Sequence, residues 1–406
     1  MYRYEFRRKI VYLKKLFNKI DNFMSKQILE GSHAIAQVIR NIKPGVVSAY
    51  PITPQTHIVE DLAEFIANGE ANYEYIKAES EFAAASIVEG AQAAGCRTYT
   101  ATSSQGLLLM LEVIYNIAGM RLPVVMTLAN RGVSAPITIW NDHQDAMSAR
   151  DTGWIMLFAE NHQEAVNQHI LAYKVGEKLR LPVIVNIDGF LITHSYEGVL
   201  VPEIKDIKKY LPNYNPKSGE YLDPENPVTL GAFASPEFYL EIRESLHKDL
   251  VLSQGEILNE YEEFKKVFAE CIDKDKKIEV DNGLIEYYGN MDAEKLLICM
   301  GSVAGTVKET IKDMNNVALL KIRAFRPFPK EEILKNIEGK KEVIILEKAI
   351  SLGFGGILAS EIKSLINFST KVKNPIIGLG GRDVTCKMIK EIIDCDCFDK
   401  EIFVAK

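Results

Sequence analysis

The chain has 406 residues, of which 47% are hydrophobic and 25% are charged, and it carries a net charge of -7. This composition is typical of a globular protein, and the length predicts roughly two or three domains with sizeable cores. The negative charge argues against a nucleic-acid-binding surface, and no apolar run is long enough to span a membrane.

The N-terminal segment, residues 1–23, differs from the rest because it carries an excess of Lys and Arg. Its pattern is that of an amphipathic surface helix, and it lacks the apolar core of a cleavable signal peptide. Met24 begins a polar segment directly before the first predicted helix. We therefore expect the functional protein to begin near Met24, with residues 1–23 as a basic extension or a start-site artefact.

Helical and strand-like patterns alternate over residues 24–225. The expected helices cover 31–42, 55–67 and 163–179, and the expected strands cover 46–50, 72–77, 123–130, 153–159 and 182–188. Between Glu79 and Gly119 the pattern is helix, short strand, helix. Strands that alternate with helices predict an α/β fold with a doubly wound, mostly parallel sheet.

The alternation breaks after this first domain, and residues 226–290 are expected to form a linker with a long charged helical region. Residues 291–406 are expected to form a second, smaller α/β domain. Its predicted strands cover 296–300, 317–322, 343–347 and 375–379, and its glycine clusters lie at 301–305, 353–356 and 378–381. None of these clusters fits the dinucleotide fingerprint, so tight turns explain them at least as well as a nucleotide site does.

Glu81 begins a predicted helix that continues with Ala and Gly rather than with basic residues. One interpretation is structural, because a carboxylate in the first turn is favoured by the helix dipole and Ser80 is a good N-cap. The other is functional. With no basic partner, burial raises the pKa of a carboxyl group and allows it to hold a proton for chemistry. The absence of a basic partner favours the functional interpretation.

Further polar residues lie at the predicted ends of strands or the starts of helices. Thr53 lies between two prolines at the end of one strand, and Arg131 lies at the end of another. Ligands bind at this edge of an open α/β sheet, where an arginine can bind a carboxylate through two hydrogen bonds. A helix cap at Thr53 and a structural salt bridge at Arg131 are the alternatives. Ser103 and Ser104 precede a buried helix, where hydroxyls either cap the helix or hold an anion.

The segment 140–151 is dense in polar groups. We expect a satisfied polar network at a subunit contact rather than a metal site, because His143 and its acidic neighbours lack a ligand spacing. The six cysteines also lack a C-x-x-C or four-ligand spacing, so no metal or cluster site is expected in this chain. The C-x-C formed by Cys395 and Cys397 is interpreted as plain thiols, and reduced thiols predict a cytoplasmic location.

Five blocks of sequence together carry a family resemblance. In chain order they are AYPITP, SEFAAASIVEGAQAAG, TATSSQGLLLMLEVIYNIAG, NDHQDAMSARDTGW and RAFRPFP. From Met24 to about Arg382, the chain resembles the alpha subunits of the pyruvate:ferredoxin oxidoreductase family, also called pyruvate synthases.

The resemblance implies thiamine diphosphate bound between this chain and a beta subunit, with a pyrimidine-binding domain followed by a transketolase C-terminal-like domain. At the matching motif position, Glu81 is implied to hydrogen-bond the aminopyrimidine of the cofactor and to promote the tautomer that removes the thiazolium C2 proton. Thr53 and Arg131 are implied to bind the carboxylate and carbonyl of a 2-oxoacid. Ser103 and Ser104 are the further cofactor-binding candidates.

The implied reaction is the reversible oxidative decarboxylation of pyruvate with coenzyme A to acetyl-CoA and carbon dioxide, with electrons passed through iron–sulfur clusters to ferredoxin. This chain has no cluster spacing and no G-D-G…N segment for magnesium diphosphate. Beta, gamma and delta subunits are therefore implied to supply the magnesium and the 4Fe–4S clusters, and the chain is expected to be inactive alone. The alternatives are a 2-oxoglutarate or branched-chain 2-oxoacid enzyme, a non-catalytic assembly subunit, and a nucleotide-binding oxidoreductase built on the glycine clusters.

Overall fold

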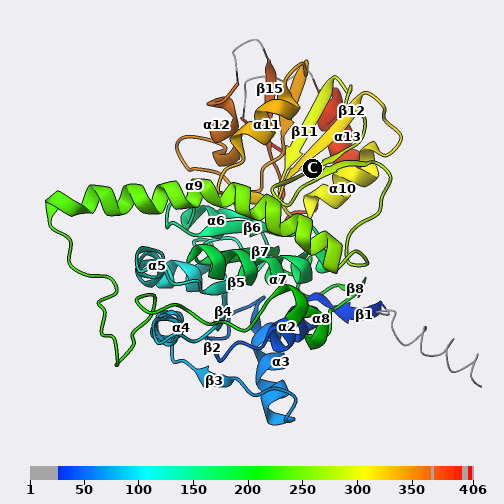
Figure 1. The fold of residues 1–406 in the computed structure, drawn as a ribbon. Helices are drawn as coiled ribbons and strands as arrows, with labels where there is room; N and C mark the ends of the chain where they lie inside the picture. The colour runs from blue at the N-terminus through cyan, green and yellow to red at the C-terminus, as the bar shows by residue number, and fades with distance from the viewer. Residues whose placement is uncertain (1–25, 367–369, 396–400, 405–406) are drawn as a thin grey trace, which may run out of the picture.

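The structure is a computed structural model that describes residues 26–366, 370–395 and 401–404. The basic extension expected at residues 1–23 lies outside the described residues. In the view of Figure 1, two α/β domains lie on either side of one long helix, α9 (Pro236–Val267). The expected α/β class is confirmed.

The first domain is built on a seven-stranded sheet with the order β13-β6-β7-β5-β4-β2-β3. Its strands are β2 (Val46–Ala49), β3 (Glu74–Lys77), β4 (Thr98–Thr102), β5 (Val125–Asn130), β6 (Ile155–Phe158), β7 (Val183–Asp188) and β13 (Ala324–Arg326). All neighbouring pairs are parallel except β13 with β6. The mostly parallel sheet expected from the sequence is thus confirmed.

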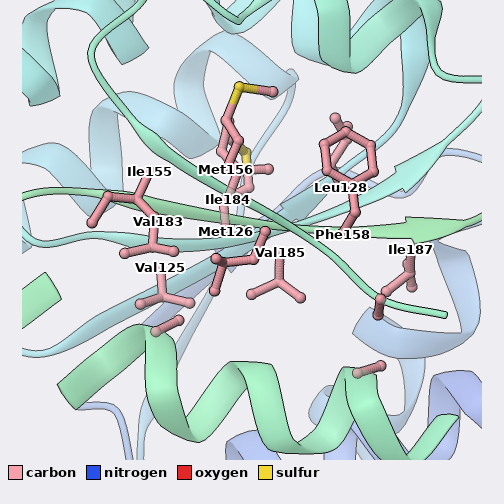
Figure 2. Close-up of a cluster of buried hydrophobic side chains, with 14 of the residues drawn as sticks. Val125, Met126, Leu128, Ile155, Met156, Phe158, Val183, Ile184, Val185 and Ile187 are labelled. Atoms are coloured by element: carbon pink, nitrogen blue, oxygen red, sulfur yellow. The ribbon is translucent and has the colours of Figure 1, made fainter. Parts of the chain in front are cut away.

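The central strands β5, β6 and β7 are buried along their whole length, and Figure 2 shows the apolar side chains that surround them. The labelled side chains are Val125, Met126, Leu128, Ile155, Met156, Phe158, Val183, Ile184, Val185 and Ile187. Mostly apolar sequences suit strands that are covered on both faces, because neither face meets water. Each such side chain contributes about 1.5–3 kcal/mol on burial, so this layer holds the strand ends firmly in place.

The helices of the first domain form two groups. Their bounds are α2 (Gly31–Ile42), α3 (Thr56–Ala67), α4 (Glu81–Ala93), α5 (Ser104–Gly119), α6 (Gln144–Ser148), α7 (His162–Leu179) and α8 (Ile204–Tyr210). Helices α4 and α5 pack side by side, and α5 also contacts α6, whereas α2 packs against α3, α7 and α8. A short antiparallel pair, β1 (Gln27–Glu30) and β8 (Tyr196–Val199), lies beside α2.

The second domain is built on a seven-stranded sheet with the order β16-β15-β14-β11-β12-β10-β9. Its strands are β9 (Ile278–Asp281), β10 (Ile285–Tyr288), β11 (Lys295–Cys299), β12 (Val317–Ile322), β14 (Glu342–Ile345), β15 (Lys371–Ile376) and β16 (Glu401–Phe403). Its helices are α10 (Val303–Ile311), α11 (Lys330–Ile337), α12 (Ile357–Lys363) and α13 (Cys386–Asp394), with a single turn, η1, at Leu379–Gly381.

One strand of this domain, β15, begins earlier than the predicted 375–379. The reason is that its polar residue Lys373 is 1% exposed and pairs with Glu342 on the neighbouring strand, with 2.5 Å between Nζ and Oε1. A buried lysine interrupts the apolar run from which a strand is recognised.

Helix α9 is 32 residues long and has Pro236 in its first turn, where proline is favoured. It contacts α7 and α8 of the first domain. Large apolar side chains near its start, including Phe238 and Leu240, are exposed. Within the described ranges, no helix is both long and apolar enough to cross a membrane.

Two features fix the second domain against the first. Strand β13 leaves the second domain and pairs with the edge strand β6 of the first sheet. A buried lysine, Lys321, lies 2.6 Å from Glu160 of the first domain and 2.8 Å from Glu286 of the second. Burial alone would lower the pKa of Lys321, but Glu160, Glu164 and Glu286 raise it well above its ordinary value. The paired charges therefore hold the two domains in one arrangement.

The glycine clusters of the second domain form turns that contact other residues of the same chain. The Ser302 N–H donates to Asp188 (3.0 Å), and the Gly381 N–H donates to the carbonyl of Asn141 (2.6 Å). Gly356 directly precedes α12, and a Cβ at this position would lie 2.3 Å from Glu347 Oε2. Tight turns and close packing account for these glycines.

Four cysteines, Cys96, Cys271, Cys299 and Cys386, are free thiols. Cys395 is disulfide-bonded, so the interpretation as a plain thiol is wrong for Cys395. Cys397 lies outside the described residues.

Candidate active site

Three of the predicted site residues lie at one edge of the first sheet. Thr53 follows β2, Ser103 follows β4 and Arg131 follows β5, and these three strands are consecutive neighbours. Because the strands are parallel, their carboxyl ends lie at the same edge, which is where ligands bind in open α/β sheets.

Arg131 is 7% exposed, and backbone carbonyl groups hold its guanidinium. Its Nη1 donates to the carbonyl of Thr53 (2.9 Å), and its Nε donates to the carbonyl of Thr138 (2.7 Å). Burial lowers the pKa of Arg131, against the opposing effect of the nearby Asp145 charge. No carboxylate among the described residues forms an ion pair with this guanidinium, so the structural salt bridge considered for Arg131 is not observed. A guanidinium fixed in this way can bind an external carboxylate.

Thr53 does not cap the helix that follows it. The N-cap residue of α3 is Gln55, and no side chain makes a cap hydrogen bond there. Gln55 instead holds the loop, because its Nε2 donates to the carbonyl of Ala101 (2.8 Å) and its Oε1 accepts from the Ile52 N–H (3.2 Å). The loop that carries the exposed Thr53 is therefore attached to β4.

Glu81 is the first residue of α4 and is 8% exposed. Ser80 caps the helix by accepting from the Ala83 N–H (3.1 Å), as the structural interpretation expected. The Glu81 carboxylate, however, makes no hydrogen bond or ion pair with any described residue. It lies against Gly106 of α5, where an added Cβ would be 2.8 Å from Glu81 Oε1. The side chain is thus mostly buried, while its carboxylate is left unpaired by the described residues and is open to a ligand.

Two hydroxyl groups at the start of α5 are also without a partner. Thr102 Oγ1 and Ser103 Oγ are buried and make no hydrogen bond within the described chain. Thr102 Oγ1 lies beside the same Gly106 as Glu81 does, because a Cβ there would be 2.4 Å from it. The Ser104 hydroxyl differs, since it donates to the carbonyl of Gly132 (2.7 Å). Thr102, next to Glu81, and the following Ser103 therefore have unused hydrogen-bonding capacity.

Asp145 is a buried residue of this site. The sequence predicted it only as part of a polar network. It is fully buried and accepts from the backbone N–H groups of Ser104 (3.0 Å) and Arg131 (2.9 Å). Burial raises the pKa of its carboxyl to about 7, against hydrogen bonds from Arg131, Asn130 and Ser104 that lower it. An acid in a short helix after a polar run was the only local signal for it.

The rest of the polar segment joins the two domains of the chain. His143 Nε2 lies 2.7 Å from Asp188 Oδ1, and Lys348 Nζ lies 3.1 Å from Asp188 Oδ2. Burial alone would raise the pKa of Asp188, but Lys348 and His143 hold it below its ordinary value. Lys348 also donates to Asn141 (2.7 Å). A polar network is present here, although Asn141 Nδ2 is buried without a hydrogen-bond partner within the described residues. Its place at a subunit contact stays a prediction.

Among the described residues, one group of three side chains has its possible metal ligands close together. The ligand atoms of Glu30, His57 and His194 lie within 4.8 Å of one another. His57 already pairs with Glu30 (2.6 Å), and His194 Nδ1 lies 2.7 Å from the Thr193 hydroxyl. These groups satisfy one another without an ion, and we assign none to them.

The surface formed by α4 and α5, the helix pair that includes Glu81, carries exposed apolar side chains. Phe82 is 40% exposed, Leu109 is 50% exposed and Tyr115 is 42% exposed. The two helices pack side by side, so these residues lie on adjoining elements. Exposed apolar surface beside a polar site is typical of a surface that another chain covers.

Comparison with known proteins agrees with this geometry. The sequence matches the family described as "Pyruvate flavodoxin/ferredoxin oxidoreductase, thiamine diP-bdg" over residues 37–261, and "Pyruvate:ferredoxin oxidoreductase core domain II" over residues 293–389. Pyruvate synthase subunit PorA of Methanocaldococcus jannaschii is 45% identical over 91% of this chain and 94% of that protein. Ketoisovalerate oxidoreductase subunit VorA of Pyrococcus horikoshii is 39% identical over 93% of this chain and 97% of that protein.

A solved structure supports the fold. It is 2-oxoglutarate:ferredoxin oxidoreductase from Magnetococcus marinus with 2-oxoglutarate, coenzyme A and succinyl-CoA bound. The similarity has a TM-score of 0.67 at 21% sequence identity, and it covers 91% of this chain and 66% of that chain.

Proposed function

This chain belongs to the pyruvate:ferredoxin oxidoreductase family, and we propose that it is an alpha subunit that contributes the pyrimidine-facing half of a thiamine diphosphate site. The observation that carries the proposal is the state of Glu81. Its side chain is 8% exposed and its carboxylate has no hydrogen bond or ion pair within the described chain, close to the partnerless hydroxyl of Thr102. The small Gly106 lets Glu81 and Thr102 pack directly against α5, because a Cβ there would lie 2.4 Å from Thr102 Oγ1 and 2.8 Å from Glu81 Oε1.

Thiamine diphosphate, when bound, supplies a carbon nucleophile and an acceptor for the electron pair that decarboxylation releases. The role of Glu81 is to hydrogen-bond the aminopyrimidine and to hold the proton whose movement activates the cofactor. Arg131 and Thr53 bind the carboxylate and carbonyl of the 2-oxoacid. Since two carbonyls fix the guanidinium before substrate arrives, little reorganisation is needed when charge develops.

The partners in this proposal are beta, gamma and delta subunits of one complex. The exposed apolar surface of α4 and α5 supports a beta subunit that covers Glu81 and supplies the diphosphate and magnesium site. The absence of any cluster spacing in this sequence supports placing the 4Fe–4S clusters in partner subunits. Coenzyme A and ferredoxin complete the reaction.

We propose pyruvate as the substrate, with a branched-chain 2-oxoacid as the second candidate. PorA of Methanosarcina barkeri is 45% identical, and VorA of Pyrococcus furiosus is 41% identical, so the margin between the two groups is small. Comparing kcat/KM for pyruvate, 2-oxoglutarate and 3-methyl-2-oxobutanoate in the reconstituted complex tests this proposal. A higher kcat/KM for either alternative than for pyruvate would reassign the substrate.

The role of Glu81 is tested by Glu81→Gln in the reconstituted complex. Glutamine keeps the shape of the side chain but cannot take up the proton, so decarboxylation is expected to fall by about 10²–10⁴-fold. Glu79→Gln is the matched control, because Glu79 is an exposed acid just before the same helix. It is expected to leave the rate unchanged. Full turnover by an assembled Glu81→Gln complex would support the assembly-subunit alternative instead.

A further inference from the structure

Asp145 is a buried carboxylate that contacts both halves of the candidate site. Its Oδ2 accepts from the backbone N–H groups of Ser104 (3.0 Å) and Arg131 (2.9 Å). Its Oδ1 accepts from Asn130 Nδ2 (3.1 Å) and from the Ala146 N–H (2.7 Å). Each oxygen thus accepts from two donors, which is what an ionised carboxylate can do and what no neutral side chain of the same shape can do.

Ser104 depends on this contact because its backbone has a φ of 45°. This left-handed conformation is unfavourable for a residue with a side chain, and it persists only where surrounding contacts hold it. Asp145 binds the Ser104 N–H, and Gly132 accepts from its hydroxyl. The conformation of Ser104 sets where the preceding Ser103 places its partnerless hydroxyl.

Arg131 depends on the same oxygen atom. Oδ2 of Asp145 binds its backbone N–H, while the carbonyls of Thr53 and Thr138 bind its side chain. Backbone and guanidinium are therefore held from different directions. Loss of the backbone contact would release the end of β5, from which the guanidinium extends.

Helix α6 places Asp145 in this position. His143 lies two residues before Asp145. Its Nε2 lies 2.7 Å from Asp188 Oδ1, and its backbone N–H donates to the carbonyl of Lys348 in the second domain (2.8 Å). A contact between the two domains therefore holds the turn that directly precedes Asp145.

We propose that Asp145 is a positioning residue that sets both the cofactor-facing turn at Ser103 and Ser104 and the substrate-binding Arg131 through one carboxylate. The inference rests on the proposed function, because it assigns Asp145 to that same site. In either orientation of its side-chain amide, an asparagine at this position would place its NH₂ group against two N–H donors. A glutamate would shift the carboxylate by one methylene. Either substitution is expected to disturb both halves of the site together.

The test uses the reconstituted complex and measures each half separately. Exchange of the C2 hydrogen of bound thiamine diphosphate with deuterium, followed by NMR without pyruvate, reports on the cofactor side. The KM for pyruvate reports on the substrate side. Glu81→Gln is expected to slow only the exchange, and Arg131→Lys is expected to raise only the KM. Asp145→Asn is expected to change both by about tenfold or more.

Glu347→Gln is the matched control, since Glu347 is a buried acid of the second domain that accepts from the N–H groups of Leu358 and Ala359 and not from the site. It is expected to leave both values within about twofold of the wild type. If Glu81→Gln and Arg131→Lys behave as stated while Asp145→Asn changes neither value or only one, the positioning role is wrong and the proposed function stands. If Glu81→Gln leaves the exchange unchanged, the proposed function itself is wrong.

A second variant keeps the test decisive if Asp145→Asn does not fold. Adding Ser104→Gly removes the conformational penalty, because glycine adopts a positive φ without strain. The double variant is expected to fold and to recover the exchange rate within about threefold, while the KM for pyruvate stays raised, since Arg131 still lacks its contact. A double variant with an ordinary KM for pyruvate would overturn the proposal.

Discussion

Substitution of Gly106 by alanine tests whether Glu81 needs the space beside it. The added Cβ would lie 2.4 Å from Thr102 Oγ1 and 2.8 Å from both Cγ and Oε1 of Glu81, whereas ordinary contact begins at 3.4 Å. To go from 2.8 Å to 3.4 Å, Glu81 must therefore move by about 0.6 Å or more. A displacement of about 1 Å at a reacting group can cost about 10²-fold in rate. We expect kcat of the reconstituted complex to fall by roughly 10–100-fold.

The stability of the Gly106→Ala variant separates this effect from misfolding. Alanine in a helix is favoured over glycine by about 1 kcal/mol, and overpacking costs about 1–3 kcal/mol, so the free energy of unfolding should change by roughly 0–2 kcal/mol. Gly90→Ala in α4 is the matched control, because a Cβ there meets nothing within 4 Å. It is expected to stabilise the chain by about 0.5–1 kcal/mol and to leave kcat unchanged. Urea unfolding and steady-state kinetics measure both quantities. A folded Gly106→Ala complex with full kcat would refute the idea that Glu81 works in this confined space.

The remaining predictions concern the substrate site and the contact between domains. Arg131→Lys should raise the KM for pyruvate by about 10–100-fold, because a lysine cannot donate in the fork geometry of a guanidinium, and steady-state kinetics measures it. Lys321→Met should destabilise the chain by about 3–5 kcal/mol in urea unfolding, because it leaves buried carboxylates without their cation. Asp188→Asn should lose stability at pH 7, because the folded-state pKa of Asp188 is held below its ordinary value. The stability that Asp188 provides is complete above its unfolded pKa of about 3.9 and is lost as the pH falls toward its folded pKa, so the difference from the wild type should shrink below about pH 4 in pH-dependent unfolding.

Each of these predictions has an outcome that would contradict it. An unchanged KM in Arg131→Lys would mean that the substrate carboxylate binds elsewhere. The exposed pair of Lys312 and Glu309 provides a control for Lys321, and Lys312→Met should have little effect on unfolding. Equal effects of the two lysine substitutions would mean that the buried cluster does not hold the domains. A stability difference for Asp188→Asn that grows on acidification would reverse the assigned sign.

Local patterns were sufficient to predict the parallel strands of the first sheet, although not β13. The helix predicted at 31–42 is observed at those bounds, because its amphipathic pattern is strong and the chain turns at Lys43, which has a left-handed φ. The strands β2, β5 and β7 were recognised from their mostly apolar sequences. Thr53 follows β2 and Arg131 follows β5. Because these strands are parallel, their carboxyl ends and both residues lie at one edge of the sheet.

Long-range contacts account for what local patterns could not predict. Helix α5 begins at Ser104, which was expected to precede the helix, since Asp145, which lies 41 residues away in sequence, binds the Ser104 N–H. Strand β13 pairs with β6 across the domain boundary, and no local pattern indicates such a partner. Nothing near Asp145 in the sequence indicates that it joins two strand ends of the site.

The central claim is that Glu81 activates a thiamine cofactor held between two chains. A structure of the assembled complex with thiamine diphosphate bound tests this claim most directly. We expect a carboxylate oxygen of Glu81 within about 2.6–3.2 Å of a pyrimidine ring nitrogen, with Arg131 facing the space next to the thiazolium ring. Glu81 turned away from the pyrimidine, or paired with a basic residue of a partner subunit, would contradict the account.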